Sequence, residues 1–333
     1  MKVHILDDWF DTLRGLPCFS KLSGHDVTIW TDHEPDPERL AARVEDCEAL
    51  VLFRERTKIK SELLDRLPNL KLISQRSVYP HIDVEACTRN GVMLCSNMHS
   101  GTPSYAAAEM TLALILASYR QIPQQVASIR AGQWQMGVGR TLRERTLGLY
   151  GYGRIARAVA DYASAIGMRV QWWASEEGRA RVRAGGESLA PSREAFFATS
   201  DIVSLHVRLK PETRGIITAA DLAQMSPRSL LVNTSRAGLI GEGVLEREVG
   251  EGRIFAAVDV FDTEPLSDTS NILLTHPNVL PTPHIGYVTE DEFDLQFNDI
   301  FDQVNAFADG KPIHVINPDV VGQTCTQQSA RPR

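Results

Sequence analysis

The sequence is poor in cysteine and has no long apolar run, and each shortage excludes a class of protein. Its five cysteines include no Cys-x-x-Cys pair, so we expect reduced thiols rather than a disulfide framework. No apolar stretch reaches the roughly 20 residues of a membrane-spanning helix, and residues 106–118 are predicted to form a buried helix. The chain begins without a basic segment and apolar core, so we expect no secretory signal and a cytoplasmic location.

The sequence also contains fewer basic than acidic residues. The 35 lysines and arginines are outnumbered by 42 acidic residues, and the net charge of −7 argues against nucleic acid or an anionic membrane as a partner. We expect no metal site, because the sequence contains no His-Glu-x-x-His motif and no cluster of Cys and His. At 333 residues the chain is too long for one core, so two domains are expected.

Short apolar runs alternate with helical patterns in two successive series. Such alternation indicates parallel sheets with helices on both faces, and therefore an α/β fold. A helical region is expected to begin near Thr102-Pro103, and another spans residues 290–308. The polar residues 321–333 are expected to be a disordered tail. The predicted strands are 3–6, 27–30, 49–53, 70–73 and 92–95 in the first series, then 146–150, 169–173, 202–206, 230–233, 255–260 and 279–281.

A glycine-rich turn follows the first strand of the second series. The run Gly151-Tyr152-Gly153-Arg154-Ile155-Ala156 has the form G-x-G-x-x-A between a predicted strand and a predicted helix. Gly151 would permit the tight turn, Gly153 a close approach of backbone to pyrophosphate, and Ala156 close helix packing. The free N–H groups at the start of the helix would face the phosphates. A dinucleotide site is favoured over a turn without a ligand.

The residue that should bind the adenosine ribose is unusual. The second strand of such a unit ordinarily ends in Asp or Glu, but here Ala174 and Ser175 occupy that place. Glu176 and Glu177 would repel a 2′-phosphate, whereas the arginines at 179 and 181 either reach back toward it or are surface charges. We therefore favour NAD and leave NADP open.

Three later strands are followed by ionisable side chains. Strand 230–233 leads to Arg236, strand 255–260 to Glu264, and strand 279–281 to His284. Ligands bind outside the carboxyl ends of the strands in open α/β sheets, so these side chains are expected at one edge. Arg236 can bind a carboxylate, and His284 can donate a proton while Glu264 favours its imidazolium form. Each residue alone has an ordinary explanation as a loop or surface residue, but the three together favour a site for carbonyl reduction.

These motifs resemble the D-isomer-specific 2-hydroxyacid dehydrogenase family, which includes D-3-phosphoglycerate dehydrogenases and glyoxylate/hydroxypyruvate reductases. The resemblance covers nearly the whole chain. The matching stretches are 147–156, Ser200-Asp201-Ile202-Val203-Ser204-Leu205-His206, Asn233-Thr234-Ser235-Arg236, 258–266 and Thr282-Pro283-His284-Ile285-Gly286.

The resemblance implies an oxidoreductase that transfers a hydride between NAD(P)(H) and a small 2-keto or 2-hydroxy acid of D configuration. Arg236 would bind the substrate, Glu264 would support the histidine, and His284 would be the acid/base. A Rossmann-type cofactor domain, 99–287, would be inserted in a flavodoxin-like substrate domain, 1–98 with 288–320. The implied cofactor-binding residues are Gly151, Gly153, Arg154, Ile155, Ala174, Ser175, His206, Val207, Thr234, Ser235 and Asp259.

The resemblance also implies a homodimer formed through the cofactor domain, with Gly132-Gln133-Trp134 in its dimerisation arm. The chain departs from the family in the loop after the fourth strand, 75–83, where the two usual glycines are absent. Arg76, Ser77 and Val78 are the predicted substrate-binding residues there, although Arg76 has the alternative of facing solvent. His81 and His99 are interpreted as structural.

Two other functions fit the same residues. Corepressors with this fold retain the three ionisable residues and act chiefly as binding modules, although they carry insertions that this chain lacks. Phosphite-type and formate-type dehydrogenases also share the fold, but formate enzymes typically carry Gln at the position of Glu264. The residues do not identify which 2-keto acid would be used.

Overall fold

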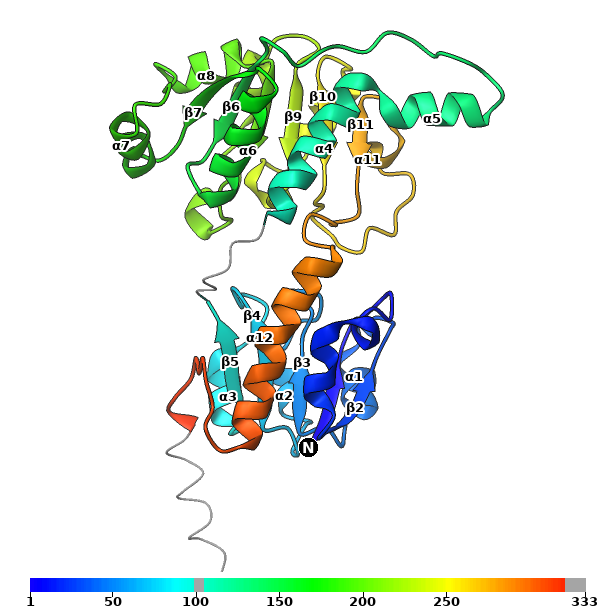
Figure 1. The fold of residues 1–333 in the computed structure, drawn as a ribbon, viewed down its shortest axis with the longest axis vertical. Coiled ribbons are helices and arrows are strands. Elements are labelled where there is room, and N and C mark those ends of the chain that lie inside the picture. Colours follow the sequence, from blue (N-terminus) through cyan, green and yellow to red (C-terminus); the bar gives the residue numbers. More distant parts are fainter. Residues whose placement is uncertain (99–104, 321–333) are drawn as a thin grey trace, which may run out of the picture. The chain divides into compact units, whose positions relative to one another are not determined.

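The chain divides into two compact units. The computed structural model describes residues 1–98 and 105–320 (Figure 1). Unit 1 comprises Met1–Pro103 with Thr289–Arg333, and unit 2 comprises Ser104–Val288. The second unit is therefore inserted in the first along the chain. The predicted cap at Thr102-Pro103, His99 and the tail 321–333 lie outside the described residues.

Unit 1 is built on a five-stranded parallel sheet. The strands lie in the order β2-β1-β3-β4-β5, which is the flavodoxin-like order. Strands β3 and β4 are buried along their whole length, because helices cover both faces of the sheet. The strands are β1 (Lys2–Ile5), β2 (Asp26–Ile29), β3 (Ala49–Val51), β4 (Leu72–Arg76) and β5 (Met93–Asn97).

The helices of unit 1 lie on opposite faces of this sheet. Helices α1 (Pro37–Arg43), α2 (Ser61–Leu64) and α3 (Val84–Arg89) share an apolar cluster with Ile73 of β4. The next residue, Ser74, points the other way and donates a hydrogen bond to the carbonyl of Ile300 in α12 (Glu290–Ala308). The C-terminal helix therefore returns to the first domain. Short 3-10 turns, Leu13–Gly15 and Pro17–Leu22, complete the unit.

Unit 2 contains a six-stranded parallel sheet in the order β11-β10-β9-β8-β6-β7. Leu189 forms one further parallel bridge to Trp172 in β7. Residues 188–190 therefore stand where the third strand of a dinucleotide-binding sheet would be. With that bridge included, the order begins 3-2-1-4-5-6, which is the Rossmann order. The strands are β6 (Thr146–Tyr150), β7 (Arg169–Trp173), β8 (Ile202–Leu205), β9 (Leu230–Asn233), β10 (Phe255–Val258) and β11 (Val279–Pro281).

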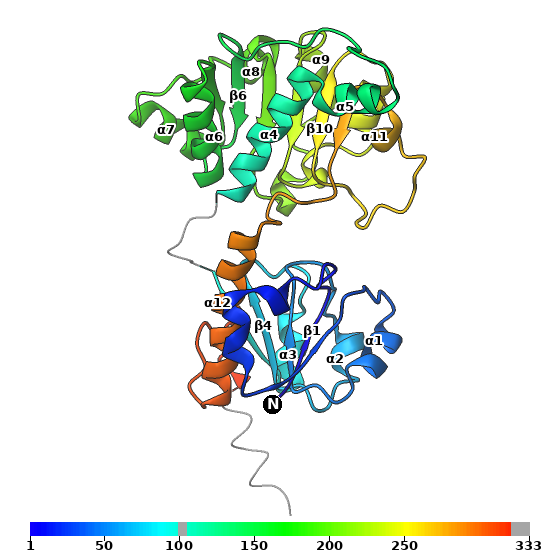
Figure 2. The ribbon, with the colours of Figure 1, turned by 45° about the vertical axis from the view of Figure 1, so that its right-hand side comes forward.

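Side chains alternate between two apolar clusters along these strands. Leu230 and Val232 of β9 join the cluster under α4 and α6, whereas Leu231 joins the cluster under α8, α9, α10 and α11. Figure 2 shows α4 and α6 lying together over the sheet. The helices are α4 (Ala106–Arg120), α5 (Ile122–Arg130), α6 (Arg154–Ala165), α7 (Glu176–Ala184), α8 (Arg193–Thr199), α9 (Ala219–Gln224), α10 (Val244–Gly250) and α11 (Ile272–Thr275), with 3-10 turns η3 (Pro211–Thr213) and η4 (Ala237–Leu239).

The predicted fold class is confirmed. Each predicted strand is present with bounds shifted by at most a few residues, and α12 has the predicted bounds. The predicted strand 255–260 ends at Val258, because the buried Asp259 turns its side chain into the loop that follows β11.

Close packing inside β6 generates a stability prediction. A Cβ added at Gly148 would lie 2.2 Å from Ser200 Oγ and 2.9 Å from the ring of Phe196. We expect Gly148→Ala to lower the free energy of unfolding by about 1–3 kcal/mol, because helix α8 must move away from the sheet. Denaturant unfolding checks this, with Gly24→Ala as the control, since nothing lies within 4 Å of a Cβ there. Equal stability of the two variants would contradict the packing.

Candidate active site

The three predicted catalytic residues follow neighbouring strands. Strands β9, β10 and β11 are adjacent in the sheet of unit 2, and all run parallel. Their carboxyl ends therefore meet at one edge. Arg236 follows β9, Glu264 follows β10 and His284 follows β11.

A short hydrogen bond joins two of these residues. His284 Nδ1 lies 2.6 Å from Glu264 Oε2. Burial by itself raises the pKa of Glu264, but the hydrogen bond and charge of His284 outweigh it and leave this pKa below its usual range. Glu264 is therefore ionised near neutral pH and can only accept, so Nδ1 carries the proton in this bond. The ring is oriented with Nε2 directed away from the carboxylate.

Further groups stabilise the ionised carboxylate. The backbone N–H of Phe261 donates to Glu264 Oε1 at 2.8 Å. The Arg236 guanidinium also contributes to the low pKa of Glu264, so the charge of Arg236 acts at the same site. The ring of Tyr287 packs edge-on against His284 at a centroid distance of 5.6 Å.

A buried carboxylate holds the loop that carries His284. Asp259 is 1% exposed, and its Oδ1 accepts hydrogen bonds from Thr282 Oγ1 at 2.6 Å and Ile285 N at 2.9 Å. Its Oδ2 accepts from Gly286 N at 2.8 Å. His284 lies between these anchors with φ of 54°, a left-handed conformation that the loop imposes. Burial raises the pKa of Asp259, and these hydrogen bonds only partly oppose the rise.

The loop that carries Arg236 is held in a similar way. The side chain of Asn233, at the end of β9, accepts from Ser235 N at 3.1 Å and donates to the carbonyl of Arg236 at 3.0 Å. Ser235 Oγ donates to the carbonyl of Leu205 in β8. Sequence reasoning placed Asn233 in a family motif without a role. Its position as the polar last residue of a buried apolar strand was the available signal.

The glycine-rich turn has the geometry that its sequence predicts. Gly151 has φ of +112°, and a Cβ there would lie 2.4 Å from the carbonyl oxygen of His206. Only glycine allows the turn after β6 to pass so close to the end of β8. The turn thus lies where the order of the sheet reverses, which is where ligands bind in open α/β sheets.

The surroundings of the second glycine, Gly153, indicate whether a dinucleotide fits this turn. Gly153 is extended, and no protein atom lies within 4 Å of the position of a Cβ. Neither backbone strain nor protein packing therefore requires glycine there, whereas close approach of a pyrophosphate does. Gly153 is the N-cap of α6 and provides no side-chain cap, so the partial positive charge of this helix N-terminus lies at the glycine turn, where it favours an anion. The residues fit NAD.

The other predicted cofactor residues surround this turn or the neighbouring strand ends. Arg154 and Ile155 open α6, and the Ile155 side chain packs on the core. His206 Nε2 lies 2.9 Å from Ser204 Oγ, and burial lowers the pKa of His206 to about 4. Thr234 Oγ1 lies 2.8 Å from Thr111 Oγ1 in α4. Val207 is half-buried beside Gly151, Ala174 is buried after β7, and Ser175 caps α7 by accepting from Gly178 N.

The predicted substrate residues belong to unit 1. Arg76 ends β4, is 7% exposed and forms an ion pair with Asp299 of α12 at 3.1 Å. It is therefore buried and paired rather than facing solvent. Ser77 has φ of 82°, so the loop keeps a glycine-like conformation without glycine. Val78 is half-buried beside it. Their contact with substrate stays a prediction.

His81 lies at the end of the same loop. Its ring is 6% exposed, and neither nitrogen has a hydrogen-bond partner in the structure. Burial lowers the pKa of His81 to about 4, so the ring is neutral near neutral pH.

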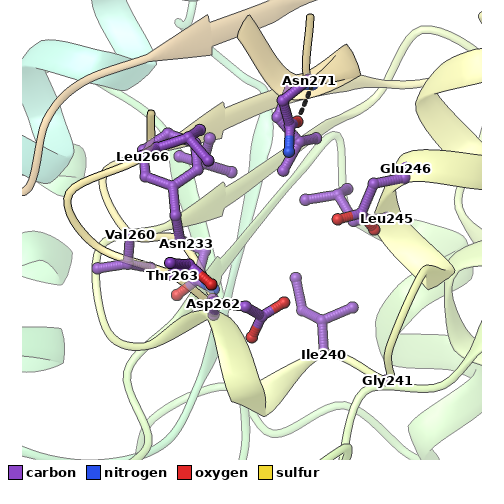
Figure 3. Close-up of a pocket in the computed structure, with 14 residues that line it drawn as sticks. Asn233, Ile240, Gly241, Leu245, Glu246, Val260, Asp262, Thr263, Leu266 and Asn271 are labelled. Carbon is purple, nitrogen blue, oxygen red and sulfur yellow. Dashed lines mark hydrogen bonds between the residues drawn. The ribbon is translucent and has the colours of Figure 1, made fainter. Parts of the chain in front are cut away.

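A pocket of about 120 Å³ lies beside the two loops that carry Arg236 and Glu264. Its wall includes Ala237 and Thr263, the neighbours of those residues in the chain. Figure 3 shows the carboxylates of Asp262 and Glu246 at this pocket, together with apolar side chains such as Ile240. These loops therefore border open space on this side.

Two kinds of feature are absent from residues 1–98 and 105–320. No group of three or more His, Cys, Asp or Glu side chains is arranged to hold a metal ion. No helix in that part of the chain has the length and apolar character needed to span a membrane.

The sequence and fold have many relatives. The family model described as D-isomer specific 2-hydroxyacid dehydrogenase, NAD binding domain, matches residues 112–286. The glyoxylate reductase of Thermococcus litoralis is 32% identical over 311 residues, which is 89% of this chain and 92% of that protein. The D-3-phosphoglycerate dehydrogenase of Methanocaldococcus jannaschii is 36% identical over 258 residues, 76% of this chain and 48% of that longer protein.

A solved structure agrees over nearly the full length. The phosphoglycerate oxidoreductase of Vibrio cholerae O395 has a TM-score of 0.89 and 43% identity, covering 93% of this chain and 99% of its own. These similarities in sequence and fold agree with the charged residues at the strand ends and with the glycine turn. The chain belongs to the D-isomer-specific 2-hydroxyacid dehydrogenases, which are NAD-dependent oxidoreductases.

Proposed function

We propose that the chain interconverts a small 2-keto acid and the corresponding D-2-hydroxy acid, with His284 as acid/base, Glu264 as its support and Arg236 as the substrate-binding cation. The observation that carries this assignment is the 2.6 Å contact between His284 Nδ1 and an ionised Glu264. This arrangement makes His284 Nε2 the atom that exchanges a proton with the substrate oxygen.

The substrate carboxylate is assigned to Arg236. A guanidinium presents parallel N–H donors that match a carboxylate or a keto-acid oxygen pair, and it stays charged at every relevant pH. One donor of Arg236 is used on the carbonyl of Ser235 at 2.7 Å, which holds the side chain at the strand end. The group can therefore bind substrate and polarise its carbonyl with little loss of side-chain freedom.

In the direction of reduction, His284 donates its Nε2 proton to the oxygen that becomes the hydroxyl. Glu264 stabilises the protonated ring before this step and keeps it oriented afterwards. In oxidation the same nitrogen accepts the hydroxyl proton. The loop held by Asp259 keeps the imidazole at a constant position through both directions.

The turn of Gly151 and Gly153 would hold the dinucleotide, with Thr234 and the end of β10 near its nicotinamide. Bound NAD(H) supplies or accepts the hydride. The relatives named glyoxylate reductase and D-3-phosphoglycerate dehydrogenase support a short 2-keto acid as substrate. The proposed substrate-binding residues of unit 1 are Arg76, Ser77 and Val78.

We further propose a homodimer formed through the arm of α5 and the residues after it. Ile122, Val126 and Ile129 lie at spacings of four and three on α5 and are 48%, 38% and 53% exposed. Figure 1 shows α5 reaching outward from the body of unit 2. Trp134 and Val138, which follow it, are 75% and 89% exposed. Exposed apolar side chains gathered on one helix and the residues after it are typical of a protein interface.

We propose a cytoplasmic location because the cysteine thiols are free. The four cysteines among the described residues, Cys18, Cys47, Cys87 and Cys95, are free and buried. Burial raises the pKa of each thiol to about 12. Free thiols suit a reducing compartment.

His284→Asn tests the assigned acid/base. Asparagine tolerates the left-handed φ at this position but cannot exchange the proton, so we expect kcat to fall by about 10²–10⁴-fold. The Kd for NADH, measured by fluorescence titration, should stay unchanged. The control is His314→Asn, because His314 is exposed in unit 1 and has a matching φ of 55°. An unchanged kcat in His284→Asn would remove this residue from the mechanism.

Arg236→Lys tests the substrate-binding cation. Lysine keeps the charge but loses the bidentate geometry, so we expect the KM for glyoxylate or hydroxypyruvate to rise by about 10–100-fold. Steady-state kinetics at saturating NADH measure the change. Arg228→Lys is the matched control, since the exposed Arg228 lies just before β9, at the opposite end of that strand. A variant with altered NADH affinity but a normal KM for the keto acid would contradict the assignment.

Ile129→Asp tests the dimer. A charge among the exposed apolar side chains of α5 should convert a dimer of twice 36.9 kDa into a monomer, because a buried unpaired carboxylate is strongly unfavourable. Light scattering coupled to size exclusion gives the mass. Ile166→Asp, at an exposed position outside the arm, should leave the dimer intact. A monomeric wild-type chain, or a dimer in Ile129→Asp, would refute this interface.

A further inference from the structure

The adenosine end of the dinucleotide site has no acidic residue where one is usual. Such sheets ordinarily place Asp or Glu at the end of the second strand to bind the ribose hydroxyls. Here β7 ends at Trp173 and is followed by Ala174, which is 6% exposed. A Cβ added at Gly178 would lie 2.6 Å from the Cβ of Ala174. Helix α7 therefore packs directly on Ala174.

A guanidinium lies at this strand end instead. Arg179 Nη1 donates to the carbonyl of Ala174 at 3.0 Å, and its Cζ lies 4.6 Å above the ring of Trp173. Two contacts with the strand end thus hold Arg179 in place. Its side chain is only 23% exposed, unlike that of an ordinary surface arginine.

A second guanidinium lies against the glycine turn. Arg181 Nη2 donates to the carbonyl of Tyr152 at 3.2 Å, and its Cζ lies 5.1 Å from the centroid of the Tyr152 ring. Tyr152 stands between Gly151 and Gly153. One bond to a carbonyl uses one of the five N–H donors of a guanidinium, so Arg181 has donors for a ligand as well.

The carboxyl ends of β6 and β7 are neighbours in the sheet. Tyr150 of β6 pairs with Trp173 of β7, and Gly151 N donates to the carbonyl of Trp173 at 2.7 Å. Arg179 therefore contacts the turn after β7, and Arg181 contacts the adjacent turn after β6. This junction is where the fold places the adenosine ribose.

We propose that Arg179 and Arg181 form a binding site for the 2′-phosphate of the cofactor, so that the chain binds NADP(H) as well as NAD(H). The inference rests on the proposed function, because it requires the dinucleotide to occupy the glycine turn. A 2′-phosphate carries nearly two negative charges near neutral pH and accepts hydrogen bonds from planar guanidinium groups.

Glu176 is the group that competes with this phosphate. Its carboxylate forms an ion pair with Arg179 and lies 3.5 Å from Arg183. The Glu176 side chain is 74% exposed, so solvent screens the pair and little is lost when Arg179 changes partner. The phosphate would take the place of Glu176 beside Arg179.

Two adenosine nucleotides test the site without turnover. Adenosine 2′,5′-bisphosphate and 5′-AMP differ only in the 2′-phosphate, and isothermal titration calorimetry measures both Kd values. We expect the wild-type chain to bind the bisphosphate about tenfold or more tightly than 5′-AMP. Arg179→Gln and Arg181→Gln should each remove most of that preference while the Kd for 5′-AMP changes by about twofold or less.

Two variants on the same helix serve as controls. Arg183→Gln removes a positive charge whose guanidinium lies near Glu176 and should preserve the preference. Glu176→Gln removes the competing acid and should tighten binding of the bisphosphate. Arg181 is exposed, so its replacement leaves the fold intact and is by itself a sufficient test.

Some outcomes of these titrations would contradict the 2′-phosphate site, and another would contradict the dinucleotide site itself. Equal affinity of the wild-type chain for the two nucleotides, or an equal loss in Arg183→Gln and Arg179→Gln, would refute the 2′-phosphate site. Weaker 5′-AMP binding in Glu176→Gln would make Glu176 a ribose ligand and would also refute it. No binding of 5′-AMP at all would instead contradict the dinucleotide site on which the proposed function depends.

Discussion

The parallel direction of the strands is the constraint on which the site depends. All strands of unit 2 point the same way, so every loop that follows a strand begins at one edge of the sheet. Residues far apart in the chain, such as Arg236 and His284, are thereby brought to neighbouring strand ends. The strand backbones are rigid because they lie between two apolar clusters. The chemistry at the edge is therefore positioned before any ligand arrives.

Rigid strands do not by themselves position a loop. The loops of the proposed catalytic residues Arg236 and His284 are each joined to the sheet by a buried polar side chain, Asn233 at the end of β9 and Asp259 just beyond β10. Asp259 acts on a different loop from its own, because its two oxygens accept hydrogen bonds from Thr282 before His284 and from Ile285 and Gly286 after it. A carboxylate is suited to this role since its two oxygens accept several N–H and O–H donors at once. Its burial would be unfavourable without them.

Much of the architecture was predictable because periodicity is a local property. Buried parallel strands are continuous apolar runs, and α12 has both an N-cap, Thr289, and an aromatic face at helical spacing. The third strand position of unit 2 was not found in the sequence. A single bridge at Leu189 requires no apolar run, so there is no pattern to detect.

The site was predictable only in part, for a related reason. Ionisable residues that follow strand ends are recognisable from their position in the sequence, and this is how Arg236, Glu264 and His284 were predicted to share one edge of the sheet. The partners of buried side chains are not. Arg76 pairs with Asp299 of the last helix, and no local pattern connects the two. Likewise Asp259 was predicted beside the cofactor, whereas the structure adds its hydrogen bonds to the histidine loop.

The turn after β7 shows how packing determines the sign of charge at a site. Gly178 and Ala174 are both small, so α7 approaches the strand end more closely than larger side chains would allow. The start of the same helix carries Arg179, whose guanidinium donates a hydrogen bond to the carbonyl of Ala174. The absence of an acid at 174 and the presence of a guanidinium beside it therefore occur at the same turn. A sequence comparison at position 174 alone would record only the loss.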